Sequence, residues 1–213
     1  MSINKIIKGY QSFYHNYEEK DDHVLKKLKA SQTPSTVIIS CSDSRVDPAM
    51  ITNANYGDVF VIRNVANIIP QFEDEHNTHH GTSAALEYAV KHLQVDNLIV
   101  MGHSNCGGIK ALVDTDFATA EDSFIKDWIE IMVDVKNNLP KDLGYKETRC
   151  CCEKDGIKQS LKNALTFDFI KERHDSGSLK VLGWYFDIDS GKMYQYDGGS
   201  DSFIDLTTHN HEI

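Results

Sequence analysis

Short apolar runs separated by amphipathic stretches are the main pattern along the chain. The runs Thr36 to Ser40, Val59 to Ile62 and Leu98 to Met101 are rich in β-branched residues, and their short length is typical of strands buried on both faces. From Gly81 to Val95 the apolar positions instead repeat at helical spacing and lead directly into the third run. A helix that feeds a buried strand is therefore expected here.

The carboxyl-terminal half continues this alternation. An amphipathic segment is expected around 124–139 and a helix over 153–171, and the expected strands cover 179–188 and 193–196. Strands that alternate with helices favour a mostly parallel sheet with helices on its faces. The predicted fold class is therefore α/β, with a mostly parallel central β-sheet flanked by helices.

Residues 1–31 carry a separate amphipathic pattern. Apolar side chains recur at helical spacing between Ile3 and Tyr14 and again between Val24 and Leu28, which predicts an N-terminal helical arm. Such an arm either covers the core of its own chain or embraces a partner subunit. With 213 residues, 4 prolines and no Gly/Ser-rich tract, the chain has no clear internal boundary, so we expect a single domain over 1–213.

The composition narrows the range of partners and locations. A formal net charge of −10 and the lack of a dense Lys/Arg run disfavour nucleic acid and anionic lipid as partners. No apolar stretch approaches the roughly 20 residues of a membrane helix, and the first residues lack the apolar run of a signal peptide, so we expect a cytoplasmic protein. The 5 cysteines are odd in number and three are consecutive, which favours free thiols or metal ligands over disulfides.

Candidate metal ligands follow two of the predicted strands. Cys41 comes directly after the first strand, and His103 and Cys106 come after the third. The carboxyl ends of parallel strands border the crevice in which α/β proteins bind ligands, so these residues can converge. Two thiolates and one imidazole leave the fourth tetrahedral position of zinc open, as catalytic zinc requires. On spacing alone, a buried cysteine and a core histidine explain the pattern equally well.

Asp43 and Arg45 place a carboxylate and a guanidinium just beyond the first candidate ligand. Arginine holds a carboxylate through a two-pronged hydrogen-bonded pair, and a carboxylate fixed beside a metal can accept the proton of a reacting hydroxide. The alternative is an ordinary surface ion pair near a turn, which contributes little to stability.

Four motifs together resemble a known family, the β-class carbonic anhydrases. They are Cys41 to Val46 (CSDSRV), Val61 to Asn67 (VIRNVAN), Ser83 to Val90 (SAALEYAV) and Gly102 to Gly108 (GHSNCGG), in the order and approximate spacing of that family. The resemblance implies one Zn2+ per chain, held by Cys41, His103 and Cys106. It also implies reversible hydration of CO2 to bicarbonate and a proton through zinc-bound hydroxide, with Asp43 orienting the hydroxide and Arg45 fixing Asp43.

The plant-type branch of the family also resembles this chain at its substrate pocket. By that resemblance Gln32 hydrogen-bonds the substrate, Phe60 and Tyr88 wall the pocket, and the groups come from two subunits. A homodimer would then be the minimal active unit, with pairing into a homotetramer expected. Without the resemblance, these residues are a polar residue before a strand, a core strand residue and a packed helix residue.

Two further residues are candidates near the pocket. Gly107 begins a predicted helix and permits close backbone approach of substrate, or it simply forms a tight turn. His92 lies one helical turn after Tyr88, so both share a face, and it is a candidate for proton export. An exposed helix histidine with no such role is the simpler interpretation. The clusters at His76, His79 and His80 and at Cys150 to Cys152 are read as a solvated loop and as free thiols.

Three other functions remain open from the sequence. The first is a β-class relative that hydrolyses CS2 or COS, since the same nucleophile attacks those linear molecules. The second is a thiol hydrolase that uses Cys106 with His103, although no residue that would orient the histidine is visible. The third is a zinc-binding protein without catalytic activity, against which the intact Asp43 and Arg45 argue.

Overall fold

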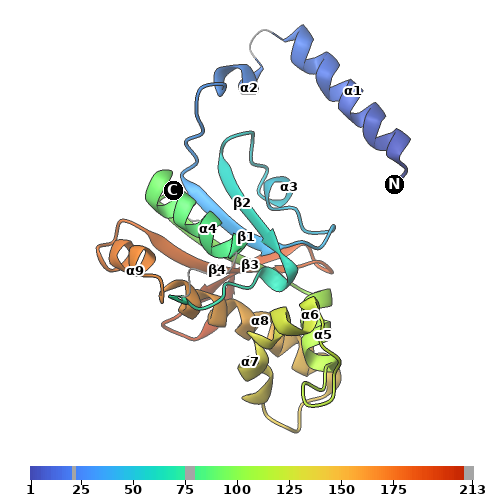
Figure 1. The fold of residues 1–213 in the computed structure, drawn as a ribbon, viewed down its shortest axis with the longest axis vertical. Helices are drawn as coiled ribbons and strands as arrows, with labels where there is room; N and C mark the ends of the chain where they lie inside the picture. The colour runs from blue at the N-terminus through green and yellow to red at the C-terminus, as the bar shows by residue number, and fades with distance from the viewer. Residues whose placement is uncertain (21–22, 75–79, 209–213) are drawn as a thin grey trace. The chain divides into compact units, whose positions relative to one another are not determined.

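The computed structural model describes residues 1–20, 23–74 and 80–208, and the chain divides into two compact units, Met1–Thr33 and Pro34–Ile213 (Figure 1). The first unit contains α1 (Ile3–Glu19) and α2 (Val24–Lys27), which confirms the N-terminal helical arm. No residue of α1 is buried, and its apolar side chains, such as Ile3 and Tyr10, are exposed. The prediction of a single domain over the whole chain stays a prediction.

The second unit is built on a sheet whose described strands run in the order β2-β1-β3-β4-β5-β6. The strands are β1 (Thr36–Cys41), β2 (Val59–Asn64), β3 (Asn97–His103), β4 (Lys180–Asp187), β5 (Lys192–Asp197) and β6 (Ser202–Asp205). Neighbours from β2 to β4 are parallel, and β5 and β6 add an antiparallel edge. The predicted α/β fold with a mostly parallel sheet is confirmed. The short polar strand β6 was not predicted, because it lacks an apolar run.

The helices of this unit differ from the expected ones in their bounds. They are α3 (Pro48–Ile51), η1 (Val65–Asn67), α4 (Gly81–Glu87), η2 (Tyr88–His92), α5 (Gly107–Asp114), α6 (Phe124–Glu130), α7 (Val133–Asn137), α8 (Tyr145–Ala164) and α9 (Asp168–Asp175). The expected helix over 153–171 was wrong at both ends. It starts earlier because the Glu147 carboxylate accepts the backbone N–H of Gly144 at 2.9 Å. It stops because the Thr166 hydroxyl donates to the Asn163 carbonyl at 2.6 Å and the chain turns before α9.

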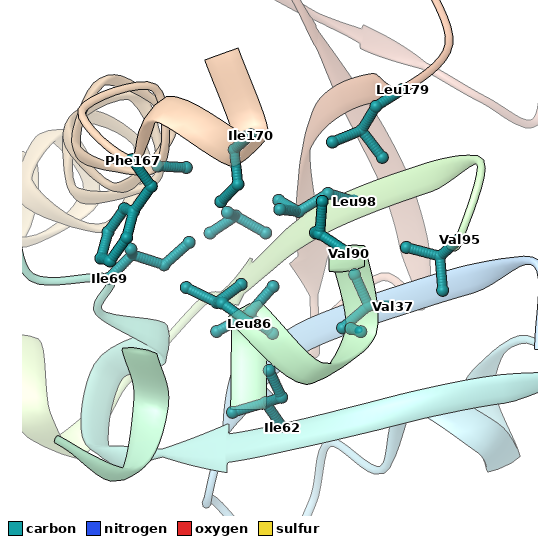
Figure 2. Packing of buried hydrophobic residues seen from close by; sticks show 14 of the residues in the cluster. Val37, Ile62, Ile69, Leu86, Val90, Val95, Leu98, Phe167, Ile170 and Leu179 are labelled. Atoms are coloured by element: carbon teal, nitrogen blue, oxygen red, sulfur yellow. The ribbon is translucent and has the colours of Figure 1, made fainter. Parts of the chain in front are cut away.

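Apolar side chains cover both faces of the central strands. On one face Val37 and Leu98 pack with Leu86 and Val90 of the α4–η2 segment and with Ile170 of α9 (Figure 2). The neighbouring strand residues Ile38, Ile99 and Met101 form a separate buried cluster, as expected where successive side chains of a strand point to opposite faces. This double burial explains why these strands read as continuous apolar runs.

A third apolar cluster lies at the carboxyl end of the strands and contains residues of α5, α6 and α7 together with Cys41 and Cys106. Helix α8 packs on β3 close to this end. A Cβ atom on Gly102 would lie 2.8 Å from the Ile157 side chain, so only glycine permits the observed approach. The core therefore fixes α8 directly behind the strand that ends in His103.

Candidate metal centre

Two neighbouring strands and one helix bring the three predicted metal ligands together. Cys41 is the last residue of β1 and His103 is the last residue of β3, and these two strands are parallel neighbours in the sheet. Cys106 lies at the N-cap position of α5. The three side chains are buried, and their ligand atoms all lie within 4.8 Å of one another. No other such group of His, Cys, Asp and Glu was found in the described part of the chain.

The imidazole of His103 is oriented for metal binding. Its Nδ1 lies 2.8 Å from the Ser104 carbonyl oxygen, so Nδ1 carries the proton and donates it there. Its Nε2 is buried and has no hydrogen-bond partner among the described residues. Ser104 is itself fixed, because its N–H donates to the Phe186 carbonyl at 2.9 Å and its hydroxyl accepts the Ile188 N–H at 2.8 Å. A buried lone pair with no donor is what a metal ion would satisfy.

The two thiols strongly influence each other. Their sulfur atoms are 3.8 Å apart. The hydrogen bond from Cys106 holds the pKa of Cys41 well below its usual range although burial opposes this. The hydrogen bond to Cys41 and burial hold the pKa of Cys106 far above its usual range. Ionisation of one thiol therefore disfavours ionisation of the other, and a positive ion between the sulfurs would relieve this repulsion.

The distance between the sulfurs tests the fit of a particular ion. Two sulfurs bound tetrahedrally at about 2.3 Å to one zinc lie about 3.8 Å apart. The observed separation of 3.8 Å agrees with this value. Two sulfurs and one unpaired imidazole nitrogen also form a donor set that zinc prefers. The cluster therefore fits a metal site.

Asp43 and Arg45 form a two-pronged ion pair beside the cluster. Arg45 Nε donates to Asp43 Oδ1 at 2.9 Å, and Arg45 Nη2 donates to Asp43 Oδ2 at 2.7 Å. Arg45 Nη2 also donates to the Asn105 carbonyl at 3.1 Å, so the guanidinium links the loop after Cys41 to the loop before Cys106. This arrangement holds the pKa of Asp43 far below its usual range. The link between two ligand-bearing loops separates this pair from an ordinary surface ion pair.

Arg63 supports the same loop from β2, and the sequence analysis gave it no role. Its Nε donates to the Cys41 carbonyl at 3.1 Å, and its Nη2 donates to the carbonyls of Asp43 at 2.7 Å and Val46 at 3.1 Å. These three carbonyl oxygens are therefore held by one side chain. A charged residue directly after an apolar strand run was the available signal, but its partners lie about twenty residues earlier and are invisible from local pattern.

Gly107 and Gly108 behave differently at the start of α5. A Cβ atom on Gly108 would lie 2.7 Å from the Val65 side chain, so Gly108 allows α5 to pack against η1. A Cβ atom on Gly107 would meet nothing within 4 Å. The close approach within the chain is therefore made at Gly108, and Gly107 faces open space next to Cys106.

Comparison with known proteins identifies the family. The family model described as Carbonic anhydrase matches residues 36–193. The chain is also 36% identical over 195 residues to Beta carbonic anhydrase 3 of Arabidopsis thaliana, and this match covers 89% of the chain and 75% of the relative. The chain belongs to the β-class carbonic anhydrases. This confirms the resemblance seen in the sequence and the prediction of an enzyme of the carbonate dehydratase class.

Other relatives and solved structures agree with this assignment to the β-carbonic anhydrases. A carbonic anhydrase of Helicobacter pylori strain J99 is 35% identical, with 92% of this chain and 90% of the relative covered. The structure of the β-carbonic anhydrase CcaA has a TM-score of 0.87 at 32% identity, covering 95% of this chain and 98% of that one. Two tetrameric β-carbonic anhydrases of Sordaria macrospora are represented at a TM-score of 0.79 and 26% identity, with 90% and 95% covered.

Two predicted pocket residues of this β-carbonic anhydrase, Phe60 and Tyr88, lie away from the cluster within one chain. Phe60 pairs with Val37 near the start of the strands, whereas Cys41 pairs with Asn64 at their end. Four strand residues separate the two levels by about 13 Å. The ring centroids of Phe60 and Tyr88 are 6.0 Å apart, so these two side chains do lie together. Gln32 is exposed and belongs to the first unit, Met1–Thr33.

His92 lies beside the predicted pocket residues, as its spacing suggested. Its ring centroid is 5.4 Å from that of Tyr88, and both residues belong to η2, a π-helical turn. Such turns are rare and often occur at functional sites. The roles of Gln32, Phe60, Tyr88 and His92 stay predictions.

Two clusters of this β-carbonic anhydrase, one of histidines and one of cysteines, were not interpreted as sites. His76 and His79 lie outside the described residues. All five cysteines are free of disulfides, and Cys150 to Cys152 lie inside α8. Burial raises the pKa of the Cys152 thiol to about 11, which makes it unreactive near neutral pH.

Proposed function

We propose that this β-carbonic anhydrase hydrates CO2 reversibly to bicarbonate and a proton, with one zinc ion held by Cys41, His103 and Cys106. The observation that carries the proposal is the buried cluster of two sulfurs and an unpaired imidazole nitrogen beside an ion-paired carboxylate. When bound, zinc supplies the Lewis acidity that makes water a nucleophile near neutral pH. The family membership of the chain supports this reaction.

Asp43 and Arg45 perform the orienting step in this proposal. Arg45 keeps Asp43 ionised, so the carboxylate accepts a hydrogen bond from the attacking water and does not donate one. An acceptor in a fixed place turns a lone pair of that oxygen toward CO2. Because Arg45 also binds the Asn105 carbonyl, the carboxylate keeps its position relative to Cys106.

The substrate pocket of the proposed enzyme is completed by a second copy of the chain. Phe60 lies about 13 Å along the strand from the level of Cys41, and Tyr88 packs beside Phe60, so both are too far away to wall the same pocket in one chain. Among the described strands, β2 forms one edge of the sheet. Next to it lies a groove of about 620 Å³ lined by Met50, Tyr56 and Val61. We therefore propose a homodimer as the minimal active unit, in which Gln32, Phe60 and Tyr88 of one copy complete the site of the other.

A homotetramer remains our expectation beyond the dimer, and the Sordaria macrospora relatives are described as tetrameric. None of the helices in the described ranges is both long enough and apolar enough to cross a membrane. The cytoplasmic location and the lack of a nucleic-acid partner stay predictions from the sequence.

Stopped-flow CO2 hydration and zinc content, measured on one preparation, test the proposed function. We expect one zinc per chain and hydration that is lost when a chelator removes the metal. A protein with no zinc, or with zinc and no hydration, would contradict the proposal. COS hydrolysis measured on the same sample tests the alternative substrate, which has no support among the relatives named above. Ready alkylation of Cys106 in the zinc-loaded protein would favour the thiol hydrolase.

A further inference from the structure

A buried carboxylate lies behind the candidate metal centre and takes no part in the proposed reaction. Glu153 of α8 is buried, with 6% of its surface exposed. Its Oε1 accepts the backbone N–H of Cys106 at 3.2 Å, and its Oε2 accepts the hydroxyl of Tyr185 at 3.1 Å. The carboxylate therefore joins a ligand of the cluster to strand β4.

The surroundings of Glu153 hold it in place. Ile157, one helical turn later on the same face of α8, packs against Gly102 of β3. Tyr185 is fixed as well, because its ring lies 6.0 Å from that of Phe203 and the Lys154 ammonium lies 5.2 Å from its centroid. Neither Glu153 nor Tyr185 is therefore free to move away from the hydrogen bond that joins them.

The amide that Glu153 binds has special importance for the cluster. Cys106 is the N-cap residue of α5, and Glu153 is the partner of its buried backbone N–H. The position of that amide sets where the Cys106 sulfur points. Groups that hydrogen-bond to a metal ligand orient that ligand and tune the affinity of the site for the metal.

We propose that Glu153, oriented by Tyr185, is a positioning residue that holds Cys106 in its metal-binding geometry. Glu153 supplies a hydrogen-bond acceptor at the correct distance from the backbone N–H of Cys106. The proposal rests on the proposed metal site, since positioning has a purpose only if Cys106 binds an ion. The proposal goes beyond the metal site by assigning a role to α8 and β4, which carry none of the three candidate metal ligands.

Zinc affinity measured by competition with a chelator tests this proposal through two contrasting variants. Glu153→Gln keeps the length and the acceptor oxygen but removes the charge, and we expect its zinc affinity to stay close to that of the wild type. Glu153→Asp keeps the charge but is one methylene too short to reach the amide. We expect it to lose roughly 10- to 100-fold in zinc affinity. Tyr185→Phe removes the orienting donor and should show a smaller loss in the same direction.

Cobalt substitution separates positioning from a general loss of stability. The cobalt-bound Glu153→Asp protein should show shifted thiolate-to-cobalt charge-transfer bands, whereas the Glu153→Gln protein should match the wild type. Thermal unfolding of the metal-free variants reports on stability independently. The matched control is Glu130→Ala, which removes an exposed carboxylate from α6 and should change neither affinity nor spectrum.

Two results would overturn the proposal. One is unchanged zinc affinity in Glu153→Asp, and the other is a loss in Glu153→Gln as large as in Glu153→Asp, which would mean that charge and not reach matters. Failure of the wild-type protein to bind zinc would instead contradict the proposed function. The two failures are therefore distinguishable on the same set of proteins.

Discussion

The two ends of the parallel strands are built in different ways. At the carboxyl end, Cys41, His103 and Cys106 are buried. Arg63 and Glu153 hold the backbone of the two cysteines, and the Ser104 carbonyl holds the His103 ring. At the amino end, Phe60, Tyr88 and His92 lie together, but Tyr88 is 45% exposed. The cluster at the carboxyl end is complete within a single chain, whereas the residues at the amino end lie on an open surface.

The difference shows which part of the function each end can perform alone. The three candidate metal ligands come from one chain, because all three converge and are supported there. Substrate binding needs side chains that a single copy does not bring to the cluster. Variants at the carboxyl end should therefore lower the zinc content or the hydration rate of their own chain. Variants at the amino end should instead lower the activity of the site in a second copy.

Cys41→Ala is expected to have the largest effect, because it removes one of three ligands from a buried site. We expect the variant to lose both zinc and CO2 hydration, measured by metal analysis and stopped-flow kinetics. Cys151→Ala is the matched control, since that thiol lies on α8 outside the cluster and should keep the metal. Full zinc content in Cys41→Ala would show that the ligand set is different.

Asp43→Ala should separate chemistry from metal binding at the same end of the sheet. Its zinc content should be unchanged, and its rate of hydration should fall by about a hundredfold, the lower range for a positioned proton acceptor. The control is Asp96→Ala, an exposed carboxylate just before β3 at the opposite end, which should keep the full rate. A rate close to wild type in Asp43→Ala would remove the orienting role from the proposed mechanism.

Mixed dimers provide the most direct test of the comparison between the two ends. Cys41→Ala and Gln32→Ala should each be inactive or nearly so as pure proteins. If the pocket residues act across the dimer, random mixing of the two leaves about one quarter of all sites with both parts intact. We therefore expect activity to return after subunits are unfolded together and refolded. If each site were complete in one chain, every site in the mixture would carry a defect and no activity would return.

Sequence reasoning predicted some residues at the carboxyl end and missed others, for a physical reason. The convergence of Cys41 and His103 was predicted because parallel strands place the residues at their carboxyl ends along a common edge, which is a local signal. The supports Arg63 and Glu153 were missed because their hydrogen bonds join segments 22 and 47 residues apart. Nothing in local spacing reports such pairings.

Helix bounds failed for a related reason. The apolar pattern predicted a helical segment from Gly81 to Val95; the structure has it from Gly81 to His92, and its division into α4 and the π-helical η2 depends on packing. The early start of α8 was signalled by Gly144 and Glu147, three residues apart, a cap that the apolar pattern alone does not show. Pattern therefore gives the presence of an element more reliably than its ends.

His92→Ala is expected to have the smallest effect and probes the open end alone. If this exposed imidazole beside Tyr88 carries protons between the site and solvent, turnover at low buffer concentration should fall a few-fold while zinc content stays unchanged. A high concentration of imidazole buffer should restore the wild-type rate, because free imidazole can take over the transfer. The variant thus acts as its own control at high buffer. Equal rates of the variant and the wild type in dilute buffer would instead mean that protons leave by another route, and that η2 serves only to place Tyr88.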